Sequence, residues 1–459
     1  MTYRLSILGF FVLFATLLFA ASIPVHRISI SGNDQTKNFV VLREMLVKVD
    51  SIYPESQIEE LIKTSTDRVL NLNLFNQVKI DYTIAESDQG RGYNVVVVLV
   101  EKWYAWPIPF VEFSDRNFNV WGDLDFDPER TNYGLYVFNY NLFGRNHTLK
   151  TQLKTGYNTN LGLEYRIPFL SRNTQWGLNT MVKYASQNEV WYETKNDSLQ
   201  FFRNGQKNLI RNTQARVELT KRITPFTTVR YGMNFEHGQL DTSVPINDYF
   251  INSQRFQRKY EVYFKIEFNQ RNNIYFPTEG KYGSVSFGAN TWQNKNRQFN
   301  GSIESRLQQF HELSHRWSSA LSVYFQYNTN KNAPYSDRKL LGYNEVVRGY
   351  EHYVIDGTLG WKTNAAIRYH LINNDLILNI IPIENYKKLP VNIYAEGYID
   401  GGYATSNDTR SSNQLNQQPI YSIGLGLNTL FYNDRLLRLE YSLNSLGKGG
   451  LFLHFKKAI

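Results

Sequence analysis

The chain has 459 residues with 32 tyrosines, 29 phenylalanines, no cysteine and a net charge of +9 at pH 7. This length exceeds one ordinary soluble domain, and the absence of cysteine fits an exported protein that avoids stray disulfides. High aromatic content with a mean hydropathy of -0.44 favours alternating strands over membrane helices. The sequence contains no run of five or six Lys or Arg residues, which argues against nucleic-acid binding.

Residues 1–22 have the pattern of a secretory signal peptide. Arg4 precedes an apolar run that ends at Ala21, and small residues occupy its exit. The alternative is a membrane anchor, but the run is short for a spanning helix and no charged stop follows it. We therefore expect cleavage between residues 21 and 23.

Residues 23–103 predict a small α/β domain with the element order β-α-α-β-β. An alternating strand at residues 25–30 is followed by a turn, and Val40, Val41 and Met45 then repeat at helical spacing. A second helical pattern follows Pro54. The unbroken apolar run at residues 95–100 predicts a strand that both helices cover on one face. We expect this segment to fold alone.

Residues 104–459 change from helical spacing to long alternating strands. At residues 260–269 and 437–443, apolar side chains alternate with polar or charged ones. Such charges would be costly inside a soluble multi-sheet protein, which is the alternative, but in a membrane barrel they face a wet lumen. The pattern predicts a transmembrane antiparallel β-barrel of roughly sixteen strands, preceded by the small domain.

One motif resembles a zinc site. His311, Glu312 and His315 match the HExxH pattern, which binds zinc when it lies on a helix. Ile303 and Leu321 belong to flanking segments of period two, so we expect the motif in a turn between strands. The sequence also has no nucleophile elbow, phosphate loop or Cys/His cluster. It therefore predicts no enzyme, no metal site and no cofactor.

A family resemblance covers nearly the whole mature chain. Residues 23–103 resemble a POTRA domain, through the segments 28–33 and 72–78 and through Thr36, Arg43 and Glu101. The remainder resembles the barrel of the BamA/TamA-type surface-antigen family, through residues 141–146, 165–169 and 271–280.

The most specific mark of this resemblance is a motif in the longest late loop, roughly residues 330–356: Val347, Arg348, Gly349 and Tyr350. In this family the loop folds back into the lumen, and its arginine meets acids on lumenal strand faces. Asp400 matches one acid, and its parity with Glu396 predicts an inward side chain. The second family acid aligns with Ala366. The resemblance thus implies a clamp in which Arg348 depends mainly on Asp400; the alternative is an exposed loop charge.

The resemblance also implies a function on other polypeptides: inserting or assembling barrels in the outer membrane, or translocating chains across it, with the POTRA domain in the periplasm. Expected partners are outer-membrane lipids, unfolded or exported polypeptides and accessory envelope proteins. The alternatives are a dedicated two-partner-type secretion pore and a passive or structural barrel.

The expected mechanism uses the seam between the first and last barrel strands, near residues 107–113 and 451–457. Gly447, Gly449 and Gly450 should shorten or loosen pairing there. An open seam would offer unpaired backbone groups to a client strand, because those groups are costly in lipid.

Overall fold

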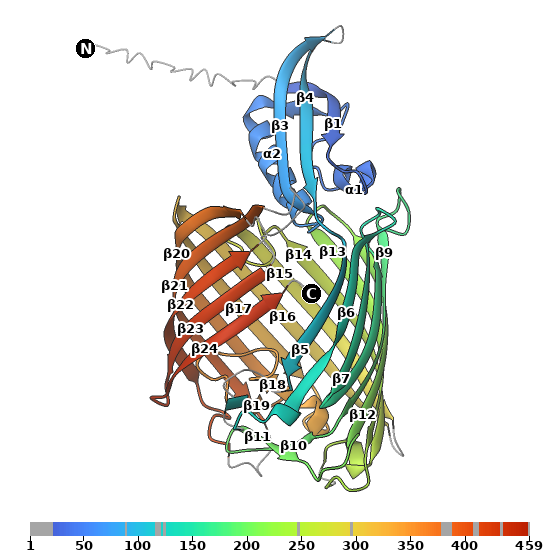
Figure 1. Ribbon diagram of the computed structural model, residues 1–459, viewed down its shortest axis with the longest axis vertical. Coiled ribbons are helices and arrows are strands. Elements are labelled where there is room, and N and C mark those ends of the chain that lie inside the picture. The colour runs from blue at the N-terminus through green and yellow to red at the C-terminus, as the bar shows by residue number, and fades with distance from the viewer. Residues whose placement is uncertain are drawn as a thin grey trace, which may run out of the picture.

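The computed structural model describes residues 22–87, 90–114, 121–122, 125–245, 248–293, 297–377, 388–406, 413–431 and 435–457. Of the predicted signal peptide at residues 1–22, all but Ser22 lies outside the described residues. Figure 1 shows a small α/β domain next to one rim of a wide β-barrel. In the described part of the chain, no helix is long and apolar enough to cross a membrane.

The small domain forms a four-stranded sheet with two helices, and the strand order is β2-β1-β4-β3. Its elements are β1 (Ser22–Ser31), α1 (Asn38–Leu42), β2 (Ile52–Pro54), α2 (Glu55–Leu70), β3 (Phe75–Ser87) and β4 (Gly90–Glu101). The predicted order omitted β2, because three residues are too few to show alternation. α1 is also shorter than predicted, since Met45 lies after its end and joins the core from a loop.

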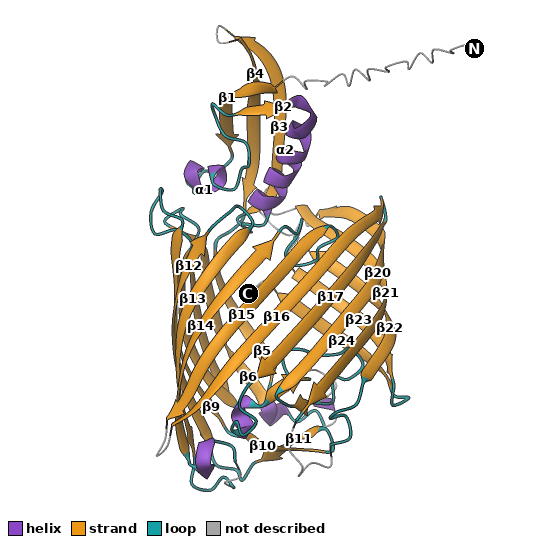
Figure 2. Cartoon of the chain, turned by 180° about the vertical axis from the view of Figure 1, so that it is seen from behind, coloured by secondary structure: helices purple, strands orange, loops and turns teal. Residues whose placement is uncertain are grey.

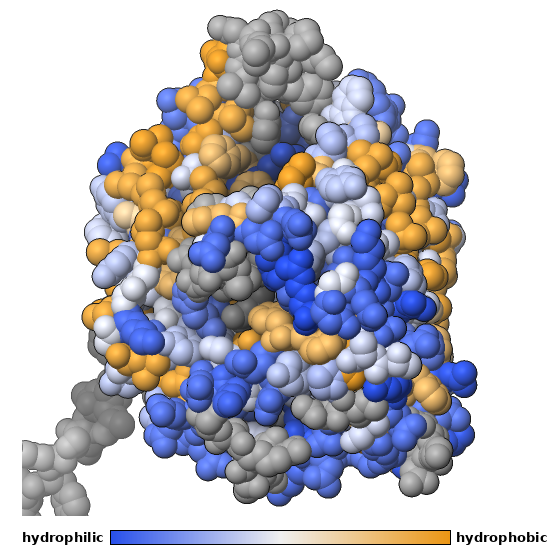
Figure 3. All heavy atoms as spheres, turned by 60° about the horizontal axis from the view of Figure 1, so that its bottom comes forward, coloured by the Kyte–Doolittle hydropathy of each residue, from blue (hydrophilic) through white to orange (hydrophobic). Residues whose placement is uncertain are grey.

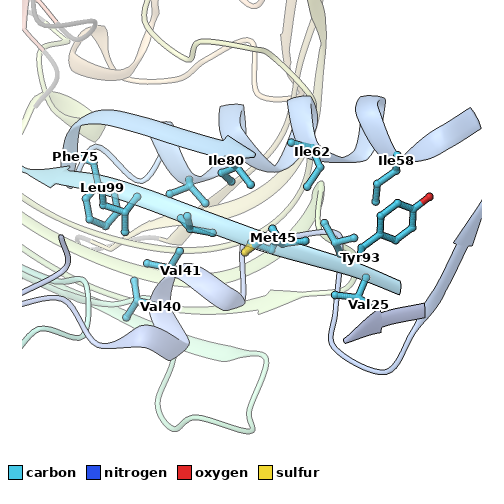
Figure 4. Close-up of a cluster of buried hydrophobic side chains, with 14 of the residues drawn as sticks. Val25, Val40, Val41, Met45, Ile58, Ile62, Phe75, Ile80, Tyr93 and Leu99 are labelled. Atoms are coloured by element: carbon cyan, nitrogen blue, oxygen red, sulfur yellow. The ribbon is translucent and has the colours of Figure 1, made fainter. Parts of the chain in front are cut away.

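The core of this domain lies on one face of β4, as predicted. Val97 is fully buried, whereas its neighbour Val98 is 46% exposed. Ile58 and Ile62 of α2 pack in the same cluster (Figure 4). Tyr104, which the sequence assigned to the barrel, also belongs to this core.

The barrel is one sheet of sixteen strands, which confirms the predicted fold. In sheet order the strands are β5 (Ala105–Phe113), β6 (Thr131–Leu142), β7 (His147–Gly156), β8 (Asn158–Ile167), β9 (Trp176–Gln187), β12 (Ile210–Arg222), β13 (Thr227–Leu240), β14 (Phe256–Asn269), β15 (Gly280–Gln293), β16 (Arg297–Ser314), β17 (Trp317–Asn328), β20 (Leu359–Ile377), β21 (Lys388–Thr405), β22 (Ile420–Phe431), β23 (Arg435–Asn444) and β24 (Gly449–Lys457). Each strand pairs antiparallel with its neighbours in this order.

Side chains along the barrel strands alternate between an apolar outer face and a polar lumen. In β21, Ile399 is 60% exposed on the outside, whereas Asp400 is 1% exposed inside. The HExxH motif follows the same period. His311 and Glu312 lie in β16, and of the three named motif residues only His315 lies in the turn. The prediction that the whole motif lies in a turn was therefore wrong for His311 and Glu312.

Short elements from several loops gather at the barrel end opposite the small domain (Figure 1). They are η1 (Pro128–Arg130), β10 (Val190–Lys195), β11 (Ser198–Phe202), η2 (Ile251–Ser253), η3 (Tyr335–Asp337), β18 (Lys339–Leu341) and β19 (Ile355–Asp356). Val190, Val244, Tyr249 and Tyr335 belong to an apolar cluster of their own at this end. Seen end-on, the surface here is largely polar, while apolar side chains gather on the flanks (Figure 3).

Candidate functional site

The loop at residues 330–356, which connects β17 to β20, is anchored by apolar burial. Val347 and Tyr350 are each 2% exposed, and both pack in a cluster with Leu341 and Ile355 of the same loop and Ile420 of β22. This burial places the motif of residues 347–350 against the inner wall of the barrel, so Arg348 is not an exposed loop charge.

Arg348 forms a bidentate ion pair with Asp400 of β21. Its Nε donates to Asp400 Oδ2 at 2.7 Å, and its Nη2 donates to Asp400 Oδ1 at 2.7 Å. The guanidinium also lies 3.5 Å from the centre of the Tyr398 ring. Bidentate arginine–carboxylate pairs are stronger and more directional than single contacts, and stacking on an aromatic face adds to them.

Two further carboxylates meet the same guanidinium. Arg348 Nη1 lies 2.6 Å from Glu396 Oε1 of β21 and 3.3 Å from Glu440 Oε1 of β23. The expectation that Arg348 depends on Asp400 because Ala366 replaces a second acid is therefore wrong. The additional acids come from other positions on the lumenal face. The strand parity of Glu396 was a sequence signal for this, since it shares a face with Asp400.

Glu396 links the clamp to a second arginine deeper in the lumen. Its Oε2 accepts from Arg368 Nε of β20 at 2.6 Å. Arg368 Nη1 donates to the Pro277 carbonyl at 2.7 Å, and its guanidinium lies 4.2 Å from the centre of the Phe276 ring. Pro277 and Phe276 lie in the turn between β14 and β15, so the ionic network extends from the loop 330–356 to a turn at the opposite barrel end.

That turn contacts the POTRA-like domain. Asn71 Nδ2 donates to the Arg271 carbonyl at 3.0 Å, and Asn71 Oδ1 accepts from the Ile274 amide at 3.2 Å. Lys63 of α2 forms an ion pair with Glu279 at 2.8 Å. The domain and the ionic network that includes the clamp therefore touch the same short segment of the barrel.

The small domain lies next to the barrel rim (Figure 2), and a second ionic contact joins the two. Glu44 is nearly buried and accepts from Arg68 of α2 at 2.6 Å and from Arg222 of β12 at 2.7 and 2.9 Å. Burial lowers the pKa of Arg68 to about 10, and burial raises the pKa of nearby Asp67 to about 6. Both shifts arise mainly from desolvation, which the charge of Glu44 partly offsets for Arg68 and the charge of Lys63 partly offsets for Asp67.

The remaining motif residues fit closely against the lumenal wall. Gly349 has a φ of 86°, and a Cβ added there would lie 3.0 Å from the Cβ of Ser442. Its carbonyl accepts from Asn444 Nδ2 at 2.7 Å. The Tyr350 hydroxyl lies 2.6 Å from Ser445 Oγ. A larger residue than glycine at position 349 would strain the backbone and push the motif off β23.

The seam between the first and last strands is open in the described part of the chain. β5 and β24 are the two ends of the sheet order, and no backbone pairing between described residues joins them (Figure 1). Gly447 lies in the turn before β24, whereas Gly449 and Gly450 are in regular register with β23. These glycines therefore do not interrupt the ladder between β23 and β24.

Comparisons with known proteins agree with this architecture. Residues 141–431 match the family model of the Omp85 superfamily domain, and residues 23–102 match the POTRA model, described as the surface antigen variable number repeat. The outer membrane protein assembly factor BamA of Neorickettsia risticii (strain Illinois) is 29% identical over 173 residues, which are 38% of this chain and 20% of that protein.

Two solved structures share the fold. The structure of BamA from Haemophilus ducreyi lacking POTRA domains 1-3 superposes with a TM-score of 0.51 and 13% identity, over 94% of this chain and 83% of that one. CdiB from Escherichia coli superposes with a TM-score of 0.54 and 12% identity, over 94% and 75% of the two chains. The chain belongs to the Omp85 superfamily, as an outer-membrane β-barrel with a periplasmic POTRA domain.

Proposed function

We propose that this protein inserts, assembles or translocates other polypeptides at the outer membrane by opening its barrel seam. The observation that carries this proposal is that no backbone pairing between described residues joins β5 to β24, in a sheet whose other neighbours pair over most of their length. Unpaired backbone groups are costly in lipid, so an open seam favours pairing with an incoming extended segment. This mechanism requires no bond chemistry.

The lumenal clamp supports this mechanism by keeping the rest of the barrel rigid. Arg348 joins the loop 330–356 to β21 and β23, the strands on the C-terminal side of the seam. The loop loses conformational entropy when it is fixed, and the ion pairs with Asp400 and Glu396 offset that cost. Opening is thereby confined to the edge between β5 and β24.

The test locks the seam with a disulfide. The chain has no cysteine, so introduced pairs give an unambiguous result. Val111→Cys is combined in turn with Leu451→Cys and Leu453→Cys, in cells depleted of the wild-type protein. We expect the oxidised seam pair to lower the amounts of other outer-membrane proteins, measured by mass spectrometry, and a reductant to restore them.

A matched control locks strands that are already paired. Leu439 of β23 lies directly opposite Leu453 of β24, so Leu439→Cys with Leu453→Cys should leave function intact. Depletion that removes one exported protein alone would instead indicate a dedicated secretion pore. Depletion that changes no other protein, together with open-channel conductance, would indicate a passive barrel and overturn the proposal.

A further inference from the structure

The outer wall of the barrel is hollowed by an apolar groove of about 950 Å³. The groove crosses six strands that are consecutive neighbours in the sheet, from β16 through β17, β20, β21 and β22 to β23. Its lining includes Leu321, Ile399 and Leu425, which are large apolar side chains exposed on the outer face. The groove therefore lies where the barrel meets hydrocarbon, away from the lumen and away from β5 and β24.

The strand registers show how the groove runs along the wall. One row of cross-strand partners lines it from β16 to β23, and the row consists of His311, Ser319, Ile367, Gly397, Leu425 and Tyr441. The β14–β15 turn lies next to the POTRA domain, so β16 returns to that rim and ends there, close to His311. Tyr441 is close to the end of β23 at the opposite rim. Because barrel strands are tilted, the groove rises through the wall from the periplasmic side toward the outer side.

The middle of the groove is open because Gly397 has no side chain. Apart from its chain neighbours, a Cβ added at Gly397 would have only the Leu425 side chain within reach, at 3.8 Å. The pairing of β21 with β20 and with β22 has no shift at this residue, so the glycine marks neither a bulge nor a turn. A glycine inside a regular strand otherwise marks a place where a ligand or another chain approaches the backbone closely.

The periplasmic end of the groove is polar. Gln309 and His311 of β16 line it, and the Nε2 atoms of the two side chains are 2.6 Å apart. Just beyond them, Trp317 and Tyr369 are cross-strand partners whose ring centres are 4.8 Å apart. Arg316 Nη1 donates to the Tyr369 hydroxyl at 3.3 Å. Trp and Tyr are typical of the boundary between membrane and water, so this end of the groove lies at the level of the lipid headgroups of the periplasmic leaflet.

Arg316 gives this end a positive charge. It is exposed, and among the described residues no carboxylate forms an ion pair with it. At the opposite end the groove is lined by Ile423 and Leu443, which are apolar. A lipid phosphate complements the guanidinium, and an acyl chain complements the apolar length of the groove. A lipid of the outer leaflet would instead bring its phosphate to the apolar end, so the charge pattern favours the periplasmic leaflet.

We propose that this groove binds a phospholipid of the periplasmic leaflet, with an acyl chain along Gly397 and the phosphate on Arg316. Lipid chains already lie in hydrocarbon, so the chain is held by close packing in the groove and the headgroup by the ionic contact. The site belongs to the wall formed by β16 to β23. It therefore does not depend on whether the seam between β5 and β24 opens.

The test measures lipid binding to the folded, full-length protein in detergent by native mass spectrometry. The probes are dipalmitoyl phosphatidylglycerol and dipalmitoylglycerol, which has the same chains and no phosphate. We expect wild-type protein to bind the phospholipid about fivefold more tightly than dipalmitoylglycerol, and Arg316→Gln to remove this difference. Gly397→Leu fills the groove and should weaken binding of the phospholipid roughly tenfold.

Gly283→Leu is the matched control, since Gly283 also faces outward, opposite Leu307, but lies outside the groove. Ser319→Leu narrows the periplasmic end and replaces Gly397→Leu if that variant fails to fold, which heat-modifiable gel mobility would show. Equal binding in wild type and the groove variants, or an equal loss in Gly283→Leu, would identify ordinary boundary lipid and overturn the site. Preferential binding of lipopolysaccharide would also overturn the proposal. If Gly397→Leu abolished a dimer and left lipid binding unchanged, the groove would belong to a second copy of this chain instead.

Discussion

The POTRA domain and the barrel place their apolar side chains on opposite sides of their sheets. In the domain, Val97 of β4 is buried beneath two helices and Val98 faces water. In the barrel, Ile399 of β21 faces outward and Asp400 faces the lumen. The domain is therefore stabilised by removing apolar surface from water, and the barrel by matching its outer face to lipid.

This difference explains why the polar interior of the barrel depends more on ion pairs than the apolar core of the POTRA domain does. The domain contains a continuous apolar cluster that specifies its packing. In the barrel, separate apolar clusters form at the β14–β15 turn and around the loop 330–356. Arg348, Arg368 and the carboxylates that they share connect these two places across the lumen. Four predictions test this contrast, from the largest expected effect to the smallest.

The largest effect is expected from a charge in the core of the POTRA domain. Val97→Asp buries a carboxylate without a partner, which costs several kcal/mol and is comparable with the total of about 5 kcal/mol that stabilises a small domain. The segment 23–103 should fold alone with a dispersed NMR spectrum and lose it in this variant. Val98→Asp, on the exposed face, should change the free energy of unfolding by less than about 0.5 kcal/mol. Equal losses in the two variants would contradict the buried-face assignment.

In the barrel, the largest effect is expected from Arg348→Ala, at about 3–5 kcal/mol, because it leaves three carboxylates without their shared cation. Asp400→Ala should cost less, since Glu396 and Glu440 still meet Arg348. The measurement is the temperature at which the folded band disappears in heat-modifiability gels.

The double variant Arg348→Ala/Asp400→Ala should be no less stable than Arg348→Ala alone, because the two residues share one contact. Additive losses would show that they do not act as a pair. Arg203→Ala is the control, since its ion pair with Asp127 is exposed and contributes less than about 1 kcal/mol.

The third prediction compares equally apolar, exposed residues in the two regions. Ile399→Arg should destabilise the barrel by about 2–4 kcal/mol in lipid, because the charge enters hydrocarbon. Val96 lies on the exposed face of β4, and its side chain is 43% exposed. Val96→Arg should therefore change the stability of the POTRA domain by less than about 0.5 kcal/mol. The barrel value comes from denaturant titration in vesicles. A negligible loss for Ile399→Arg would place this face outside the membrane.

The smallest effect is expected from pH at the contact between the two regions. Burial, together with the charge of Glu279 on the barrel, raises the pKa of Asp67 from 3.8 to about 6, so we expect the docked state to bind a proton more tightly than the undocked state. Docking should therefore be strongest at low pH and weaken as the pH rises through about 6. Spin labels at Glu59→Cys and Asn173→Cys should show a broader distance distribution at about pH 7.5 than at about pH 5.

Asp67→Asn is the control for that measurement, since the amide does not titrate. Its distance distribution should be the same at both pH values. A pH dependence that persists in Asp67→Asn would assign the effect to another group at the contact.

The sequence alone determined both kinds of architecture, because periodicity is a local property. Alternation with a period of two predicted the barrel and the lumenal position of Asp400, and helical spacing after Pro54 predicted α2. The motif at residues 347–350 also located the loop that enters the lumen. The sequence did not predict β2, because a strand of three residues is too short to show an alternating pattern.

Only the tertiary structure decided which side chains meet. Glu396, Glu440 and Arg368 lie on three different strands, and their distances to one another depend on strand registers that no local pattern encodes. The same reason applies to the seam. The two prolines of β5 are visible in the sequence, but their direction depends on which residues of β5 bond to β6. Pairing between strands, and not the composition of either strand, turned the donor-less nitrogens of Pro107 and Pro109 away from β6.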